Sequence, residues 1–198
     1  PAWDMIQLAV TMGNFIMPSN AEQVMFRDLL IKALEPFPNV RDYLIQMRFK
    51  PKPRYGAGLF LDIDTPIFEA SLVGEMVPQP AIIANETETL LDEILGVGFA
   101  LIGQSDGAKH AMSKFGRTSL LGLPLVTLDL NTMGRTTQTA VRSTGTDTER
   151  PLLTHRDQIL LIRPDRYCAA AIFPDDLEEA LSRYETLFSR AEINTRVA

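Results

Sequence analysis

Two histidines and one cysteine are present among the 198 residues of this chain. His110 or His155 could act as a general base for Ser105, or pair with Asp157 in a triad-like arrangement. We expect no such site, because the two histidines are far apart and no serine lies in a nucleophile-elbow motif. His110 falls within a predicted helix and His155 precedes a predicted strand, so both are predicted to be surface or capping residues.

The single cysteine, Cys168, excludes an internal disulfide and any C-x-x-C redox or zinc motif. It lies in an apolar stretch, residues 167–173, that predicts a strand with Cys168 on the same face as Ala170 and Ile172. We therefore expect a buried structural thiol of low reactivity.

Carboxylates gather in the first turn of the last predicted helix, at Asp175, Asp176, Glu178 and Glu179. Their interaction with the helix dipole accounts for them without acid–base chemistry. Asp62 and Asp64 are too sparse to hold a metal ion. The sequence therefore assigns no catalytic, cofactor-binding or metal-binding residue.

Nucleotide cofactors bind where a glycine-rich turn lets the backbone approach a pyrophosphate at a helix N-terminus. The chain has no G-x-G-x-x-G motif. The short motif Gly96-Val97-Gly98 precedes a predicted strand and not a helix, so we interpret it as a turn.

Composition limits the classes of protein to consider. The chain is 45% apolar and 22% charged, as is ordinary for a soluble globular protein. Its net charge of -6 argues against a nucleic-acid surface. No apolar run approaches the ~20 residues that span a bilayer, and no secretory leader is visible, so a cytoplasmic protein without a membrane partner is expected.

The first 47 residues are predicted to be helical. The helix over residues 3–17 is apolar on nearly all sides and should be buried on more than one side. Ser19 and Glu22 form the pattern of a capping box for a second helix, with a core stripe through Phe26 and Leu29. Residues 48–73 follow as an extended linker, because repeated X-Pro pairs disfavour helix at its start.

Residues 74–198 are predicted to form an α/β domain. The expected strands are residues 81–84, 99–103, 123–130, 159–163 and 167–173, and the expected helices are residues 87–95, one capped by Asp106 and one capped by Asp175 or Asp176. Strands 159–163 and 167–173 should pair as a hairpin through a Pro164-Asp165-Arg166 turn. Residues 131–150, rich in Thr, Gly and Arg, should be a mobile insertion.

Four sequence blocks together resemble the C-terminal part of flavin-dependent aromatic-ring hydroxylases of the 3-(3-hydroxyphenyl)propionate hydroxylase type. They are A-V-T-M-G-N-F-I-M-P at residues 9–18, M-R-F-K-P-K-P-R-Y-G at 47–56, G-E-M-V-P-Q-P at 74–80 with L-L-D-E-I-L-G-V-G-F-A-L-I-G at 90–103, and R-P-D-R-Y at 163–167. The blocks follow the family's order. The resemblance implies a thioredoxin-like C-terminal domain, with a mixed sheet flanked by helices, after a helical segment and an extended linker.

The resemblance also implies a function. The full-length enzyme would hydroxylate a phenolic ring with FAD, NAD(P)H and O2, and this part would brace a missing N-terminal FAD and substrate domain. The family's Gly-Asp pair near the flavin ribose is absent, so no cofactor is expected on this part alone and we expect it to be inactive by itself. The residues expected to contact the other domains are Arg48, Lys50, Arg54 and Gln79. A homo-oligomer is left open as a partner.

A second interpretation is a free-standing, redox-inactive thioredoxin-like module for binding or dimerisation. Where a redox member carries C-x-x-C, this chain has Gln104-Ser105-Asp106-Gly107, so no thiol exchange is expected. Such a module would have to hide its apolar first helix in an oligomer. The ring substrate and the choice of NADH or NADPH are not specified by the sequence.

We predict that the isolated chain binds no flavin, because both FAD motifs are missing. Titration with FAD, followed by flavin fluorescence, should show no saturable change. Saturable, tight binding by the monomeric chain would contradict this interpretation.

Overall fold

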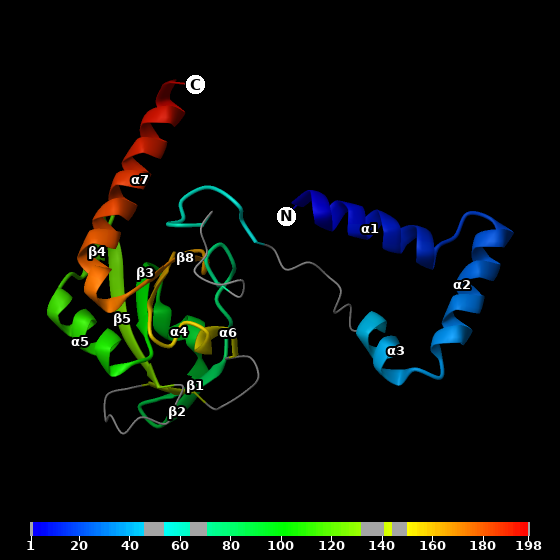
Figure 1. The fold of residues 1–198 in the computed structure, drawn as a ribbon, viewed down its shortest axis with the longest axis horizontal. Coiled ribbons are helices and arrows are strands. Elements are labelled where there is room, and N and C mark those ends of the chain that lie inside the picture. The colour runs from blue at the N-terminus through cyan, green and yellow to red at the C-terminus, as the bar shows by residue number, and fades with distance from the viewer. Residues whose placement is uncertain (1, 46–53, 64–70, 132–140, 144–149, 198) are drawn as a thin grey trace. The chain divides into compact units, whose positions relative to one another are not determined.

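The computed structural model describes residues 2–45, 54–63, 71–131, 141–143 and 150–197 (Figure 1). The chain divides into two compact units, Pro1–Arg54 and Tyr55–Ala198. The predicted docking residues Arg48 and Lys50 lie outside the described residues.

The first unit contains the helices α1 (Ala2–Ile16), α2 (Ala21–Leu34) and α3 (Pro38–Ile45). The predicted cap of α2 is wrong by one residue. Asn20 is the N-cap and accepts a hydrogen bond from the Gln23 N–H at 2.9 Å, while the Gln23 side chain accepts from the Ser19 N–H at 3.0 Å. Asparagine caps a helix as well as serine does. Because the helix starts one residue later than predicted, Gln23 and not Glu22 makes the reciprocal bond.

The predicted core of these helices is not formed within the unit. Trp3 is 68% exposed, Phe26 66% and Leu29 61%, and the described side chains of α2 include none that is buried. Three short helices have too little volume to enclose a core of their own. The unit therefore presents apolar side chains on its surface.

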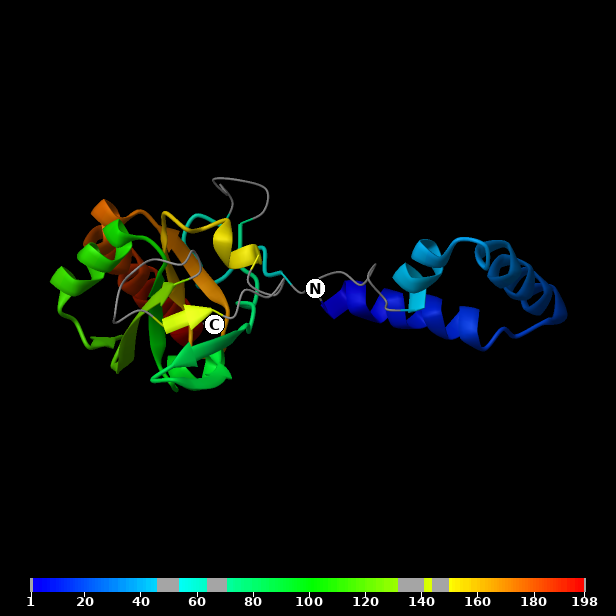
Figure 2. The ribbon, with the colours of Figure 1, turned by 90° about the horizontal axis from the view of Figure 1, so that it is seen from below.

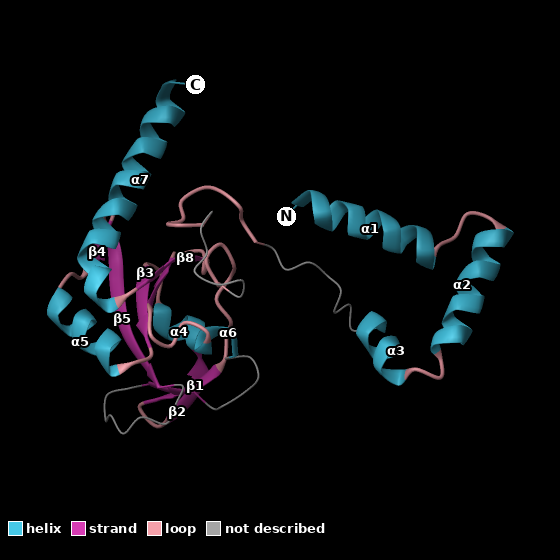
Figure 3. Cartoon of the chain, in the orientation of Figure 1, coloured by secondary structure: helices cyan, strands magenta, loops and turns pink. Residues whose placement is uncertain are grey.

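The described residues of the second unit include eight strands that form one sheet. In chain order these are β1 (Ala81–Ala84), β2 (Thr87–Leu90), β3 (Phe99–Gly103), β4 (Ser119–Leu120), β5 (Leu123–Asn131), β6 (Val141–Ser143), β7 (Ile159–Ile162) and β8 (Cys168–Ile172). Their order in the sheet is β2-β1-β6-β5-β3-β7-β8, and β4 pairs with β5. Figure 3 shows the strands in magenta and the helices in cyan. β3 is parallel to β5 and antiparallel to β7, and β7 and β8 form the predicted hairpin.

Helices cover both faces of this sheet, because alternate residues of its strands enter two separate cores. Leu101 and Leu161 pack with α5 (Asp106–Phe115) and α7 (Leu177–Val197). Ile102 and Leu160 pack with α4 (Leu91–Leu95) and α6 (Arg150–Leu153). Figures 1 and 2 show these helices around the strands. The structure is thus a mixed sheet flanked by helices, as predicted.

Several predicted elements are corrected. Residues 87–95 form β2 and α4 and not one helix, because Asn85 and Glu86, at φ 48° and 66°, make a tight turn that pairs Ala84 with Thr87. α5 is capped by Ser105 rather than Asp106, since the Ser105 hydroxyl accepts from the Ala108 N–H at 3.2 Å.

The start of the last helix and the predicted insertion also differ. Pro174–Asp176 form a 3-10 turn before α7 with Phe173 as its N-cap, so Asp175 and Asp176 lie inside this helical stretch. Val141–Ser143 pair with β5 as strand β6, which places a strand within the predicted mobile insertion. Residues 132–140 and 144–149 of that insertion lie outside the described residues.

Gly98 allows the turn before β3 to contact the start of β5. A Cβ atom at Gly98 would meet the carbonyl oxygen of Pro124 at 2.1 Å, a distance that side chains do not tolerate. The Gly96-Val97-Gly98 motif is therefore a turn, as predicted, and its second glycine is needed for a close backbone approach.

Gly98→Ala should lower the free energy of unfolding by about 1–3 kcal/mol or more, because the backbone of Pro124 must move. Chemical denaturation measures this change. Gly107→Ala is the matched control, since the atoms nearest to its new methyl group lie at 3.9 Å. Equal effects of the two substitutions would disprove the close approach.

Candidate functional site

The outer edge of β8 is covered by a segment that precedes the sheet in the chain. We call this segment the strap and define it as residues 54–63 and 71–77. Its backbone bonds to the hairpin are Leu61 N–H to Ala169 O at 2.8 Å, and Gly74 N–H to Cys168 O, Cys168 N–H to Glu75 O and Val77 N–H to Arg166 O, each at 2.9 Å. An uncovered edge strand can pair with another chain. The strap covers this edge and completes the sheet.

The described part of the predicted linker is accordingly packed on the sheet. Phe60, Leu61, Leu72 and Val73 are all buried, with exposed fractions of 3–7%. The strap thus supplies apolar side chains to the two cores as well as backbone hydrogen bonds.

Arg166 anchors the hairpin turn to helix α4. Its backbone has φ 70°, in the left-handed region, at the predicted turn after Pro164. Its guanidinium donates to the carbonyls of Gly96 at 2.6 Å and Asp92 at 3.2 Å, and its Nε lies 3.0 Å from the Asp92 carboxylate. A cation at the carbonyl end of a helix is stabilised by the helix dipole. The Arg166 side chain therefore fixes the hairpin turn against α4.

Arg163 connects the same turn to the strap. Its guanidinium lies 4.9 Å from the centre of the Phe60 ring and binds the Asp165 carboxylate at 2.6 Å. The Tyr55 ring stacks on Phe60 at 5.7 Å and meets Tyr167 edge to face at 4.9 Å. Because Arg163 contacts a ring of the strap and a carboxylate of the turn, it joins the strap to the hairpin.

His155 is a buried structural residue, which corrects its prediction as a surface or capping residue. It is 1% exposed, and its Nε2 accepts a hydrogen bond from the Leu72 N–H at 2.9 Å. Its Nδ1 lies 2.8 Å from the Gln158 side-chain oxygen and therefore carries the proton. Burial lowers the pKa of His155, and the bond to Gln158 opposes that shift. A neutral imidazole thus holds the strap.

Cys168 is fully buried, as predicted, but its predicted face is wrong. It packs in the core that contains α4 and α6, whereas Ala170 and Ile172 pack in the core that contains α5 and α7. The reason is a bulge: Leu161 pairs with Ala170 and Ile162 with Cys168, so Ala169 is extra. Burial raises the pKa of the Cys168 thiol to about 12, which leaves it protonated and unreactive.

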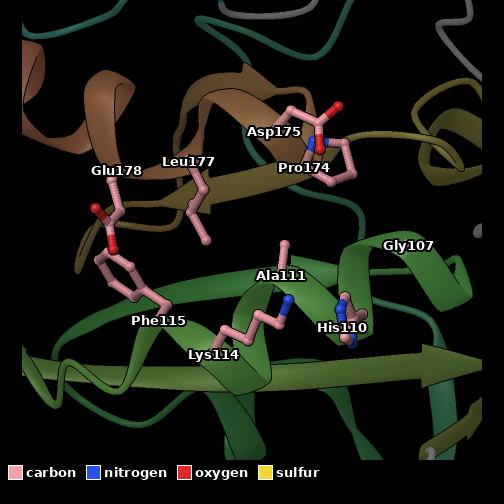
Figure 4. A pocket seen from close by; sticks show the side chains of 9 residues that line it. All are labelled: Gly107, His110, Ala111, Lys114, Phe115, Pro174, Asp175, Leu177 and Glu178. Carbon is pink, nitrogen blue, oxygen red and sulfur yellow. The ribbon is translucent and has the colours of Figure 1, made fainter.

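His110 lines a hollow of about 390 Å³ between α5 and the start of α7 (Figure 4). Lys114 stands on the same helix, Asp175 and Glu178 lie on the opposite wall, and Leu177 points toward Ala111.

The catalytic set considered from the sequence is not assembled. Ser105 is engaged as the cap of α5, and Asp157 pairs with Arg156 at the surface. His155 is buried against Leu72. Ser105, His155 and Asp157 are thus each engaged by described residues outside that set.

Within the described ranges, no three His, Cys, Asp or Glu side chains come together in a way that could hold a metal ion. The described helices likewise include none with the length and hydropathy needed to cross a bilayer. Of the predicted docking residues that are described, Arg54 begins the strap and Gln79 is exposed just beyond it.

Sequence reasoning missed the anchoring roles of Arg163, Arg166 and His155. A signal was available for the two arginines, because charged residues stand between two apolar strands. The partner of His155 lies 83 residues away, and no local pattern indicates it.

Comparison with known protein families gives a match to the HcaD C-terminal domain over residues 74–187. A 3-(3-hydroxy-phenyl)propionate/3-hydroxycinnamic acid hydroxylase of Mycolicibacterium gilvum is 32% identical over 176 residues, which cover 84% of this chain and 31% of that protein. The protein of the same name from Klebsiella pneumoniae strain 342 is 32% identical over 187 residues, covering 90% of this chain and 33% of that protein. The chain spans about a third of the length of these relatives.

Among solved structures, aklavinone-11 hydroxylase in complex with FAD and aklavinone matches 68% of this chain and 26% of its own, at 16% identity and a TM-score of 0.46. The flavin-dependent monooxygenase PieE, in complex with FAD and substrate, matches 89% of this chain and 32% of its own, at 14% identity and a TM-score of 0.46.

The lowered pKa of His155 predicts a loss of stability in acid. The folded state binds fewer protons than the unfolded state below pH 6.5, so the free energy of unfolding should be level above pH 6.5 and fall as the pH drops further. His155→Leu should cost about 1–3 kcal/mol at pH 7.5, because it leaves the Leu72 N–H unpaired, and should weaken this acid dependence.

Urea denaturation at a series of pH values measures both effects. His110→Gln is the control, because it changes the other histidine and keeps the bond to Leu72. An unchanged acid dependence in His155→Leu would show that the imidazole does not hold the strap.

Proposed function

The chain belongs to the HcaD C-terminal domain family, and we propose that it is the C-terminal third of a flavin-dependent aromatic-ring hydroxylase. The observation that carries this proposal is the extent of the sequence match. Relatives named as 3-(3-hydroxy-phenyl)propionate/3-hydroxycinnamic acid hydroxylases align with 84–90% of the chain, well beyond the domain at residues 74–187.

The whole enzyme would hydroxylate a phenolic substrate of the phenylpropionate or cinnamate class, with FAD, NAD(P)H and O2, in the cytoplasm. In this scheme the flavin supplies the oxygen chemistry and the upstream part of the polypeptide holds it. This chain would be a docking and bracing part without catalytic residues of its own.

The first unit supports a docking role. Its exposed apolar side chains, such as Trp3, Phe26 and Leu29, are of a kind that folded proteins cover. We propose that the upstream FAD and substrate domain covers them, with Arg48, Lys50, Arg54 and Gln79 contributing polar contacts.

We further propose that the second unit is a redox-inactive thioredoxin-like domain. The order β3-α5-β5-β7-β8-α7, with β3 and β5 parallel and β7 and β8 antiparallel, supports this assignment. At the end of β3, where a redox member would carry its cysteines, Gln104 donates from its side chain to the Leu152 carbonyl at 2.7 Å. Gln104 thus holds α6 against the end of β3.

A second candidate is a free-standing thioredoxin-like module for binding or dimerisation. The exposed apolar side chains of the first unit favour it as well, since a second copy would cover them equally. The two candidates differ in whether the chain completes a hydroxylase.

A chimera tests the proposal. The matching C-terminal third of the Mycolicibacterium gilvum hydroxylase is replaced by this chain, and the truncated hydroxylase serves as the reference. We expect the chimera to retain FAD and to hydroxylate 3-(3-hydroxyphenyl)propionate within about tenfold of the parent rate, a difference of ~1.4 kcal/mol. A chimera as colourless and inactive as the truncated enzyme would contradict the proposal.

Two arginine variants of the chimera serve as a matched pair. Arg166→Met removes the anchor between the hairpin and α4 and should reduce the amount of flavin-loaded protein. Arg156→Met removes a surface arginine paired with its neighbour Asp157 and should leave that amount unchanged.

A further inference from the structure

A hollow of about 280 Å³ lies at the end of the sheet where β3 and β5 begin. Apolar side chains supply most of its surface, namely Leu59, Phe99, Leu123, Pro164, Tyr184 and Phe188. These residues come from the strap, the two parallel strands, the hairpin turn and α7. Elements far apart in the sequence thus combine to form an apolar depression.

The apolar surface extends beyond the hollow onto the turn before β3. Val97 is 86% exposed and Leu123 is 43% exposed. The parallel register pairs Phe99 with Leu125, and Gly98 approaches Pro124; continuing this register places Val97 opposite Leu123. A contiguous exposed apolar patch of this kind marks an interaction surface.

The rim of the hollow is polar and internally paired. Arg163 and Asp165 line it and bind each other at 2.6 Å. A paired rim leaves no unsatisfied charge when a partner covers the apolar centre. The surface therefore suits an apolar protein segment better than a charged ligand.

We propose that this hollow receives the upstream, catalytic part of the same polypeptide, an inference that rests on the proposed function. The chain covers only 31–33% of its relatives, so about two thirds of such an enzyme precedes it. That part is joined to the second unit through the first unit of this chain, on the same polypeptide.

The connection enters the second unit beside the hollow. Tyr55, the first residue of this unit, stacks on Phe60 and contacts Tyr167, and Leu59 lines the hollow itself. Every part of the same polypeptide is held at a high effective concentration, which a second copy of the chain lacks. The upstream part is therefore favoured over a second copy as the occupant.

Cysteine labelling tests the proposal, because Cys168 is buried with a pKa raised to about 12 and gives little background. Val97→Cys is placed in the isolated chain and in the hydroxylase chimera, and the rate of maleimide labelling at that peptide is followed by mass spectrometry. We expect labelling to be at least about tenfold slower in the chimera, as a tethered contact would give. Leu90→Cys, with the same 43% exposure as Leu123 but on β2, should label at equal rates in both proteins.

Leu123→Glu and Val97→Glu supply a second readout in the chimera. Leu123→Glu should restore fast maleimide labelling of Val97→Cys, and Val97→Glu should restore fast labelling of Leu123→Cys. Leu90→Glu should restore neither. Val97→Glu lies in an exposed turn and is expected to fold, so the test does not depend on Leu123→Glu alone.

The outcomes separate the two proposals. A chimera that retains FAD but labels Val97→Cys as fast as the isolated chain overturns the docking inference and leaves the proposed function standing. Labelling of the isolated chain that slows as its concentration rises identifies a second copy as the occupant and also overturns the inference. A chimera without flavin contradicts the proposed function itself.

Discussion

The backbone pairing between the strap and the outer edge of β8 holds the second unit together at the point where the chain enters it. Four hydrogen bonds of 2.8–2.9 Å join the two segments. Arg163 and Arg166 then hold the hairpin from its two sides, one against the Phe60 ring and the other against the end of α4. Because of this pairing, a connection that would otherwise be flexible becomes part of the folded domain.

Two described side chains that could carry chemistry, His155 and Cys168, contribute to the structure instead. The neutral imidazole of His155 accepts the Leu72 N–H of the strap, and Cys168 exchanges backbone hydrogen bonds with Gly74 and Glu75 as a protonated, buried residue. A domain built in this way suits the docking role proposed for it. The chain spans about a third of the length of its relatives.

The sequence predicts the parts of the fold that depend on local patterns. The apolar run of β3, the Pro164-Asp165 turn and the burial of Cys168 all follow from neighbouring residues and are confirmed. Features that depend on distant contacts were not predicted: the bulge that turns Cys168 to the other core, the bond from Leu72 to His155, and the packing of the strap. Where two residues compete for one local role, as Ser105 and Asp106 do at the cap of α5, the pattern fixes the helix but not the cap.

Amide hydrogen exchange, read residue by residue by NMR, tests most directly whether the strap and the sheet form one body. The account predicts that the amides of Leu61, Gly74, Val77 and Cys168 exchange as slowly as those of β3, only through global unfolding of the second unit. Fast exchange of the strap amides while β3 stays protected would contradict it, since the strap would then detach without unfolding the domain.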